Sequence, residues 1–429
     1  MTRSVLTNST CVAVLGLFSA GLCGAAELFL VSAQGGNSTN EVYRFSVAGA
    51  ASAATLTLTI ADPNLLQPIG ITFDGSGAMF VTNRASYGGV PSLAISHQPL
   101  ATSSVFDSTY TDGTFHFPHG VKVWHNQLFV LQTTETGSPS DPGSVSRYSL
   151  QPNQVPLFQD SIPNLGGQAR WVAVHPTTGE VFVTQCCGAN RIDRFVLNSS
   201  GNYVPNGSIS GNGLANPHGM TFSSSGELFV ANPDWGTVSR FKFDSAGIAT
   251  PSGNIGGNYG AIDVAFSPWG ELFVSSHLQP AVYRWTFDSA GDAISNGSFS
   301  TPQTLGGLAF YPSGLHHICL LYDSAKAVRS GSTLPVKLQL CDGNGNDVSS
   351  PTLSLHATAV SRVLDSISGP VEDSGNANPD NDFRFDTSLG PTGGYIFNLS
   401  TKGLSTGTYN LNFTVSGDSF VYSAPFQVK

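Results

Sequence analysis

The sequence predicts an all-β protein in two parts: a six-bladed β-propeller closed by its N-terminal strands, followed by an immunoglobulin-like β-sandwich. Three observations lead to this expectation. A short apolar phrase recurs six times, the repeat stops near residue 315, and the composition suits short strands joined by tight turns, with 48 Gly and only 11% charged residues. We expect the propeller over residues 27–314 and the sandwich over residues 315–429.

The recurring phrase is an apolar inner strand. It begins at residues 69, 119, 170, 218, 262 and 306. Successive phrases start roughly 44–51 residues apart, and repeats of this length with several strands each are typical of propeller blades. The first five phrases are each followed by a short turn, which contains Gly in four of them, and by a second strand of the Leu-Phe-Val type. A third strand often places an Arg before an aromatic residue, as at Arg147, Arg194, Arg240 and Arg284.

The sixth repeat lacks its own second strand, and the N-terminal region supplies a match. Residues 27–30 have the second-strand pattern and residues 42–45 have the third-strand pattern. We therefore expect the start of the mature chain to complete the blade that contains residues 306–310. Closure of this kind removes free sheet edges, which otherwise promote aggregation.

Residues 1–26 have the features of an export signal. Arg3 gives a short positive region, residues 11–22 are apolar, and small residues permit cleavage near Ala26. The apolar run is shorter than the roughly 20 residues that span a bilayer, so we expect no transmembrane segment in the mature chain. The sequence predicts a secreted or periplasmic protein. Its formal net charge of −10 argues against nucleic acid as a partner.

Export also decides how the cysteines are interpreted. Four lie outside the signal, and in an oxidising compartment they can pair in several ways. Cys319 and Cys341 lie in adjacent predicted strands and are the first choice for a pair. Cys186 and Cys187 would then form a vicinal disulfide or remain two free thiols. As a disulfide they would make a rigid apolar platform for a ligand.

The pattern changes after the repeats. Apolar and polar residues alternate over 334–340, 352–356, 395–399, 408–415 and 420–422, as in half-buried antiparallel strands. About seven short strands in a segment of this length favour an immunoglobulin-like sandwich. Residues 331–338, 375–378 and 395–404 resemble the PxKF module of exported bacterial proteins, with Leu338 replacing the Phe. The resemblance implies an accessory domain without known chemistry.

Strand direction predicts which propeller face carries a site. In each blade, the start of the first strand and the loop between the second and third strands share one face, around the central channel. That face should gather the ligand-binding candidates Arg84, Tyr87, His119, Arg170, Cys187, His218, Asp234, Trp235, Asp263 and His277.

Two of these candidates occupy the same position in the repeated phrase. His119 and His218 each follow Pro and precede Gly, so alternate blades aim both imidazoles toward the channel axis. This geometry can hold zinc, although a catalytic zinc usually has three protein ligands. The alternative is that each imidazole hydrogen-bonds backbone groups at the rim of the channel.

The repeats resemble those of NHL and gluconolactonase-type six-bladed propellers, a group that includes streptogramin lyases and peptidylglycine amidating lyases. Pro-His-Gly at 118–120 and 217–219 looks like the zinc-binding phrase of the amidating lyases. Gly306 stands where that pattern has a third His, and Cys187 stands where it has a Tyr. Asp263 matches one position of the lactonase calcium site. The resemblance implies zinc or calcium in the channel.

Three functions follow from these observations. The first is an exported binding protein whose channel face captures a small ligand or a cell-surface partner, with Arg170 holding an anionic group and Trp235 and Tyr87 giving apolar contact. The second is a metal-assisted lyase or lactonase with His119 and His218 as ligands. The third is a structural or adhesive protein of the cell envelope.

Overall fold

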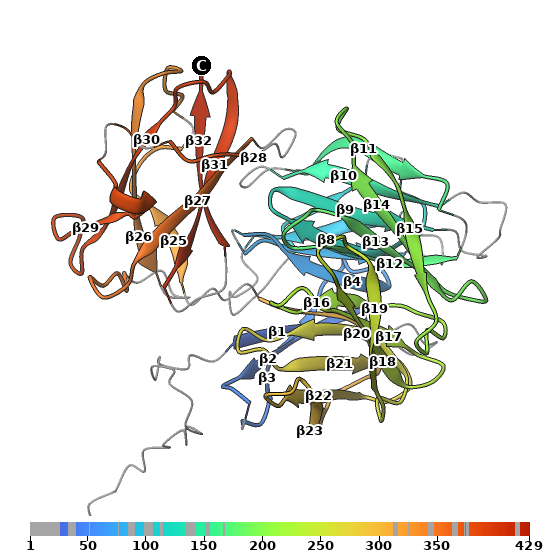
Figure 1. Ribbon diagram of the computed structural model, residues 1–429. Coiled ribbons are helices and arrows are strands. Elements are labelled where there is room, and N and C mark those ends of the chain that lie inside the picture. The colour runs from blue at the N-terminus through green and yellow to red at the C-terminus, as the bar shows by residue number, and fades with distance from the viewer. Residues whose placement is uncertain are drawn as a thin grey trace, which may run out of the picture.

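The structure of the protein is a computed structural model (Figure 1). The structure describes residues 26–32, 40–50, 52–75, 77–84, 91–97, 106–111, 115–133, 143–150, 155–165, 168–311, 316–324, 326–341, 347–362, 368–372, 374, 377–416 and 421–429. These residues form β-strands and one short 3₁₀ helix. No helix among them is long and apolar enough to cross a membrane.

Six four-stranded antiparallel sheets form the blades of a propeller (Figure 1). Blade 1 contains β4 (Pro68–Phe73), β5 (Met79–Asn83), β6 (Ser92–Ser96) and β7 (Ser108–Tyr110). Blade 2 contains β8 (Pro118–Trp124), β9 (Gln127–Gln132), β10 (Ser144–Ser149) and β11 (Leu157–Pro163). Blade 3 contains β12 (Ala169–Val174), β13 (Val181–Gln185), β14 (Arg191–Leu197) and β15 (Tyr203–Ser210).

The remaining blades follow the same plan. Blade 4 contains β16 (Met220–Phe222), β17 (Leu228–Asn232), β18 (Thr237–Phe243) and β19 (Ala249–Ile255). Blade 5 contains β20 (Ala261–Phe266), β21 (Leu272–Ser276), β22 (Ala281–Phe287) and β23 (Ala293–Ser300). Blade 6 contains β24 (Leu305–Phe310), β1 (Ala26–Ser32), β2 (Glu41–Val47) and β3 (Thr55–Ala61).

The first strands of the blades form a closed ring. Each of β4, β8, β12, β16 and β20 contacts the next inner strand, and β24 returns to β4. The N-terminal strand closes the last blade, since Leu28 of β1 pairs with Phe310 of β24. Ala26, the last residue of the predicted signal, is buried in β1 and pairs with Val47.

Glycine in the repeated phrase allows neighbouring blades to approach closely. A Cβ added to Gly70 would lie 2.5 Å from the carbonyl oxygen of His119 in the next blade. A Cβ added to Gly120 would lie 2.7 Å from the Cα of Trp171. Side chains at these positions would push the inner strands apart, so the phrase keeps glycine where backbone meets backbone.

The arginines of the third strands join consecutive blades. Arg240 of blade 4 pairs with Glu227 of its own blade at 2.9 Å and donates to the carbonyl of Gly291 in blade 5. Its guanidinium also lies over the Phe229 and Phe287 rings. Four arginines in this position each pair with a carboxylate and also donate to a carbonyl of the next blade: Arg147, Arg194, Arg240 and Arg284. These contacts are structural.

Two further four-stranded sheets follow the propeller, as a separate unit in Figure 1. One contains β25 (His317–Leu320), β26 (Thr333–Cys341), β30 (Gly394–Ser400) and β29 (Arg384–Asp386). The other contains β28 (Ser368–Gly369), β27 (Leu355–Arg362), β31 (Gly407–Val415) and β32 (Val421–Val428). The 3₁₀ helix η1 spans Pro379–Asn381. Both sheets contribute to one apolar core, and a disulfide joins Cys319 and Cys341.

One expected strand is shorter than the sequence indicates. The phrase at 218–222 begins two residues before β16, which starts at Met220. The backbone before β16 still contacts β17, since His218 N–H donates to the carbonyl of Ala231 at 3.0 Å, and Gly219 N–H donates to the carbonyl of Ile262 in the next blade at 2.9 Å. His218 therefore lies in the loop that leads into its strand.

Candidate functional site

One repeated position holds the loops of the channel face in place. In five of the six blades, the last residue of the second strand has a side chain that hydrogen-bonds the loop leading into the inner strand. Asn232 Oδ1 accepts from Ala215 N–H at 3.0 Å, and Gln185 donates to the carbonyl of Leu165 at 2.8 Å. Asn232 and Gln185 are buried and hydrogen-bonded, so they position the site without being open to a ligand.

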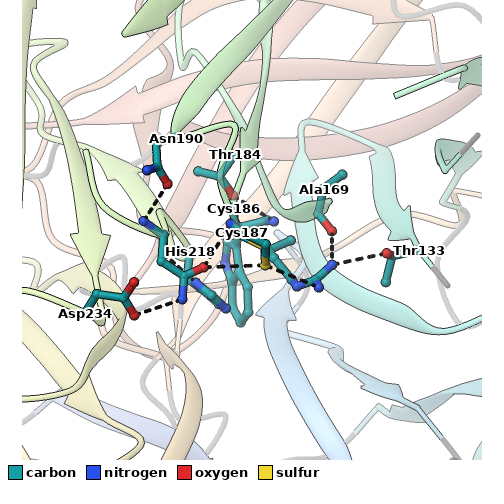
Figure 2. Close-up of a disulfide and its surroundings, with 11 residues drawn as sticks. Thr133, Ala169, Thr184, Cys186, Cys187, Asn190, His218 and Asp234 are labelled. Atoms are coloured by element: carbon teal, nitrogen blue, oxygen red, sulfur yellow. Dashed lines mark hydrogen bonds between the residues drawn. A yellow bond between two sulfur atoms is a disulfide. The ribbon is translucent and has the colours of Figure 1, made fainter. Parts of the chain in front are cut away.

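A disulfide between sequence neighbours lies at this face, in the loop between β13 and β14 (Figure 2). Cys186 is buried and its N–H donates to the carbonyl of Gln168 at 2.9 Å. Cys187 is exposed, and its backbone is left-handed with φ 56°. Gly188 follows with φ 109°, where L-residues with a side chain rarely fit. The turn therefore presents the Cys187 sulfur to solvent on an anchored support.

Arg170 lies against this disulfide. Its Nη2 is 3.7 Å from Sγ of Cys187, and its Nη1 donates to the carbonyl of Ala169 at 3.0 Å and to the hydroxyl of Thr133 at 3.3 Å (Figure 2). Burial, and then the charge of Arg84, lower the pKa of Arg170. All the hydrogen-bond partners of this guanidinium among the described residues are neutral, and no ion pair there includes it.

His119 is an interior neighbour of the two arginines. Its side chain is only 4% exposed, and its Nδ1 has no hydrogen-bond partner among the described residues. Burial first, and then the charges of Arg84, Arg170 and His218, hold the pKa of His119 well below its usual range. The imidazole is therefore neutral at pH 7 and keeps unused hydrogen-bonding capacity.

His218 and His277 are each oriented by a backbone carbonyl. Nδ1 of His218 lies 2.8 Å from the carbonyl oxygen of Asn216, and Nδ1 of His277 lies 2.9 Å from that of Gly260. Burial lowers the pKa of His218 to about 4, against the opposing effect of the Asn216 carbonyl. The His218 contact matches the rim hydrogen bond that the sequence left as an alternative to zinc, whereas Nδ1 of His119, the other residue of that alternative, has no such partner among the described residues.

Asn216 connects the disulfide to the next loop. Its Oδ1 accepts from Cys187 N–H at 3.3 Å, and its Nδ2 donates to Asp234 at 3.1 Å. Its own N–H donates to Asn190 at 2.9 Å. Asp234 is exposed, and the adjacent Trp235 is 65% exposed. This aromatic side chain is therefore available for contact rather than packed on its own blade.

Asp263 lies deeper and differs from the other candidates. It is 4% exposed, and its two carboxylate oxygens accept from the backbone N–H groups of Val264 and Leu308 at 2.9 and 3.0 Å. Burial raises the pKa of Asp263 to about 7, although those two N–H groups and Lys122 act in the opposite direction. Burial also lowers the pKa of Lys122. Asp263 therefore serves the packing between blades rather than the open face.

Apart from the buried Asp263 and from Tyr87, the candidate residues separate into two groups. Arg84, His119, Arg170, His218 and His277 interact electrostatically around the channel mouth. Cys187, Asp234 and Trp235 belong to the loops beside it. Tyr87 lies outside the described residues. The sequence alone does not mark Thr133, Asn190 or Asn216 as candidates. Asn190 and Asn216 have a left-handed backbone, which asparagine tolerates better than most residues, so asparagine in a turn is the signal that could have marked them.

The described side chains at the channel mouth do not fit a divalent metal ion. Among the described residues, no three His, Cys, Asp or Glu side chains are grouped to hold one. The imidazole of His119 lies in the field of Arg84 and Arg170, and that of His218 lies in the field of Arg170; these guanidiniums would also repel a dication. Both oxygens of Asp263 accept backbone N–H bonds, which leaves a weak ligand for calcium.

Comparisons with solved structures concern the fold. No protein-family model and no curated protein sequence matches the chain. A periplasmic gluconolactonase of Pseudomonas aeruginosa is 17% identical, with a TM-score of 0.49, over 67% of this chain and 85% of its own. A catalytically inactive virginiamycin B lyase of Staphylococcus aureus, in a structure with quinupristin, is 12% identical, with a TM-score of 0.42, over 76% and 94%. A functionally unknown protein of Desulfotomaculum acetoxidans is 15% identical, with a TM-score of 0.47, over 75% and 94%. These likenesses are to propellers, and no activity is carried over from them.

Proposed function

We propose that the protein is an exported binding protein that captures a small organic anion at the channel face of its propeller. The observation that carries this proposal is Arg170, a half-buried guanidinium with only neutral partners among the described residues. Leaving a charge without a counter-charge in a partly desolvated place costs free energy. A bound carboxylate or phosphate would supply the missing charge.

The chemistry around Arg170 suits such a ligand. A guanidinium presents paired N–H donors that match the two oxygens of a carboxylate or phosphate group. His119 adds a neutral imidazole with an unpartnered buried nitrogen, and the nearby Cys187 sulfur gives an apolar surface. These groups can bind and orient an anion without any covalent step, so binding is the function that these residues support best.

A titration tests this proposal. Benzoate, citrate and inorganic phosphate are titrated into the full chain by calorimetry at constant ionic strength, with neutral benzamide as the uncharged control. We expect at least one of the anions to bind, benzamide not to bind, and Arg170→Ala to lose roughly tenfold or more in affinity, since a charged hydrogen bond contributes about 1.5–3 kcal/mol. Binding that is equal in Arg170→Ala, or absent for all three anions, would overturn it.

The other hypotheses remain competing proposals. A metal-assisted lyase or lactonase needs a metal that the channel-mouth residues do not fit, and an adhesive role needs a partner for the outer surfaces. We also infer that the C-terminal sheets form an immunoglobulin-like accessory sandwich, and that the chain is secreted or periplasmic. Two disulfides support the oxidising compartment that this location implies.

A further inference from the structure

A second unbalanced charge lies across the disulfide from Arg170. The exposed carboxylate of Asp234 accepts a hydrogen bond from the neutral Asn216 amide, and it forms no ion pair among the described residues. Figure 2 shows Asp234 to one side of Cys187 and Thr133, a partner of Arg170, to the other. The open face therefore carries a cation at one end and an anion at the other.

The path between the two charges runs through neutral groups and is short. From Arg170 Nη2 to Cys187 Sγ is 3.7 Å, from Sγ to Asn216 Oδ1 is 3.7 Å, and from Asn216 Nδ2 to Asp234 Oδ1 is 3.1 Å. An extended peptide advances about 3.3–3.6 Å per residue, so three or four residues span roughly 10–14 Å. A molecule of that length can reach from one charge to the other.

Exposed aromatic side chains stand at the anionic end. Trp235 follows Asp234 directly and is 65% exposed, and Tyr259 is 60% exposed. The two loops touch, because a Cβ added to Gly236 would lie 3.1 Å from the Cα of Tyr259. Aromatic faces beside a carboxylate favour an ammonium group and the apolar side chain next to it.

We infer that the channel face binds a dipolar ligand, a short peptide with free termini, whose carboxylate meets Arg170 and whose ammonium group meets Asp234 with its first side chain against Trp235. This inference rests on the proposed anion site and adds a second recognition element to it. The oriented charges set the direction of the peptide across the disulfide. A simple anion would leave Asp234 unused.

The test uses one tripeptide, Phe-Gly-Gly, in three forms: free, N-acetylated and C-terminally amidated. Each is titrated by calorimetry into the wild-type chain, Asp234→Asn and the control Asp292→Asn, which alters an exposed carboxylate in the turn between β22 and β23. Asparagine at 234 retains the acceptor for Asn216. We expect N-acetylation to weaken binding roughly fivefold to tenfold in the wild type and in Asp292→Asn. In Asp234→Asn the free and acetylated peptides should bind equally.

The outcomes distinguish failure of the peptide inference from failure of the proposed anion site. If free and acetylated peptides bind the wild type equally while amidation removes binding, the dipolar inference fails and the anion site stands. If amidation has no effect, the anion site itself is contradicted. Absence of binding for all three peptides overturns the peptide inference, and the anion titration then decides the proposed function separately. Should Asp234→Asn fail to fold, the comparison of peptide forms on the wild type still decides.

Discussion

Arg170 and the arginines of the third strands lie in the same propeller but differ in whether a carboxylate lies beside them. Arg240 and Arg284 are nearly buried, pair with carboxylates of their own blade, and donate to carbonyls of the next blade. Arg170 has no carboxylate within ion-pair distance among the described residues, and it lies close enough to Arg84 for like charges to lower its pKa. This contrast supports our proposal that the repeated ion pairs hold the fold together, whereas Arg170, which lacks such a partner among the described residues, binds a ligand.

The largest expected effect is on stability and concerns the arginines that are paired with carboxylates. Replacing Arg240 by Ala leaves Glu227 as an unpaired buried carboxylate and removes the link to Gly291, so we expect a loss of about 3–5 kcal/mol in the free energy of unfolding. Chemical denaturation of the propeller measures it. Arg191→Ala is the matched control, because Arg191 and its partner Asp193 are more exposed and such pairs contribute about 0–1 kcal/mol. Equal losses in the two variants would break the comparison.

The next effect concerns the neutral imidazoles of the site. The pKa of His218 is about 4 in the folded protein and about 6.5 for an unperturbed imidazole in the unfolded chain, so the unfolded chain binds more protons between those pH values. Folding stability should therefore fall as the pH drops from 6.5 to 4, by about 3 kcal/mol in all from this residue.

His218→Gln should flatten that part of the stability profile. Denaturation at closely spaced pH values compares the variant with the wild type, and NMR titration of the imidazole follows the same group directly. An imidazole that titrates near pH 6.5 in the folded protein would show that the site is less desolvated, and less cationic, than its geometry indicates.

A third test measures the metal content of the protein, which we expect mutation not to change. Elemental analysis of the purified mature protein should find no stoichiometric zinc or calcium, and His119→Ala/His218→Ala should not change the result, because two imidazoles beside two guanidiniums make a poor dication site. One zinc per chain that is lost in the double variant would favour the lyase hypothesis over the binding hypothesis.

The blades could be predicted from sequence because each repeat contains the same local pattern. The phrase positions, the second strands and the closure by residues 27–30 all depend on apolar spacing, which a sequence shows directly. The face that carries His119, Arg170 and Cys187 follows from strand direction alone.

Other features depend on contacts between loops and could not be predicted in this way. Nothing in the spacing of Asn216 shows that its amide joins Cys187 to Asp234, since those three residues belong to two blades and meet only when the blades pack side by side. The two oxygens of Asp263 looked available for a ligand in the sequence, but neighbouring backbone N–H groups occupy them. The hydrogen bond from Gly219 N–H to the carbonyl of Ile262 likewise joins two blades, so a single repeat does not show it.

The most direct test of the account compares the two kinds of arginine in one binding experiment. Benzoate, citrate and phosphate are titrated into Arg170→Gln and Arg191→Gln, the second of which alters an arginine of the same blade that already has a carboxylate partner. We predict that Arg170→Gln loses anion binding while keeping the wild-type unfolding transition, and that Arg191→Gln retains both. Undiminished binding in Arg170→Gln, or an equal loss in the two variants, would contradict the claim that the uncompensated guanidinium is the ligand site.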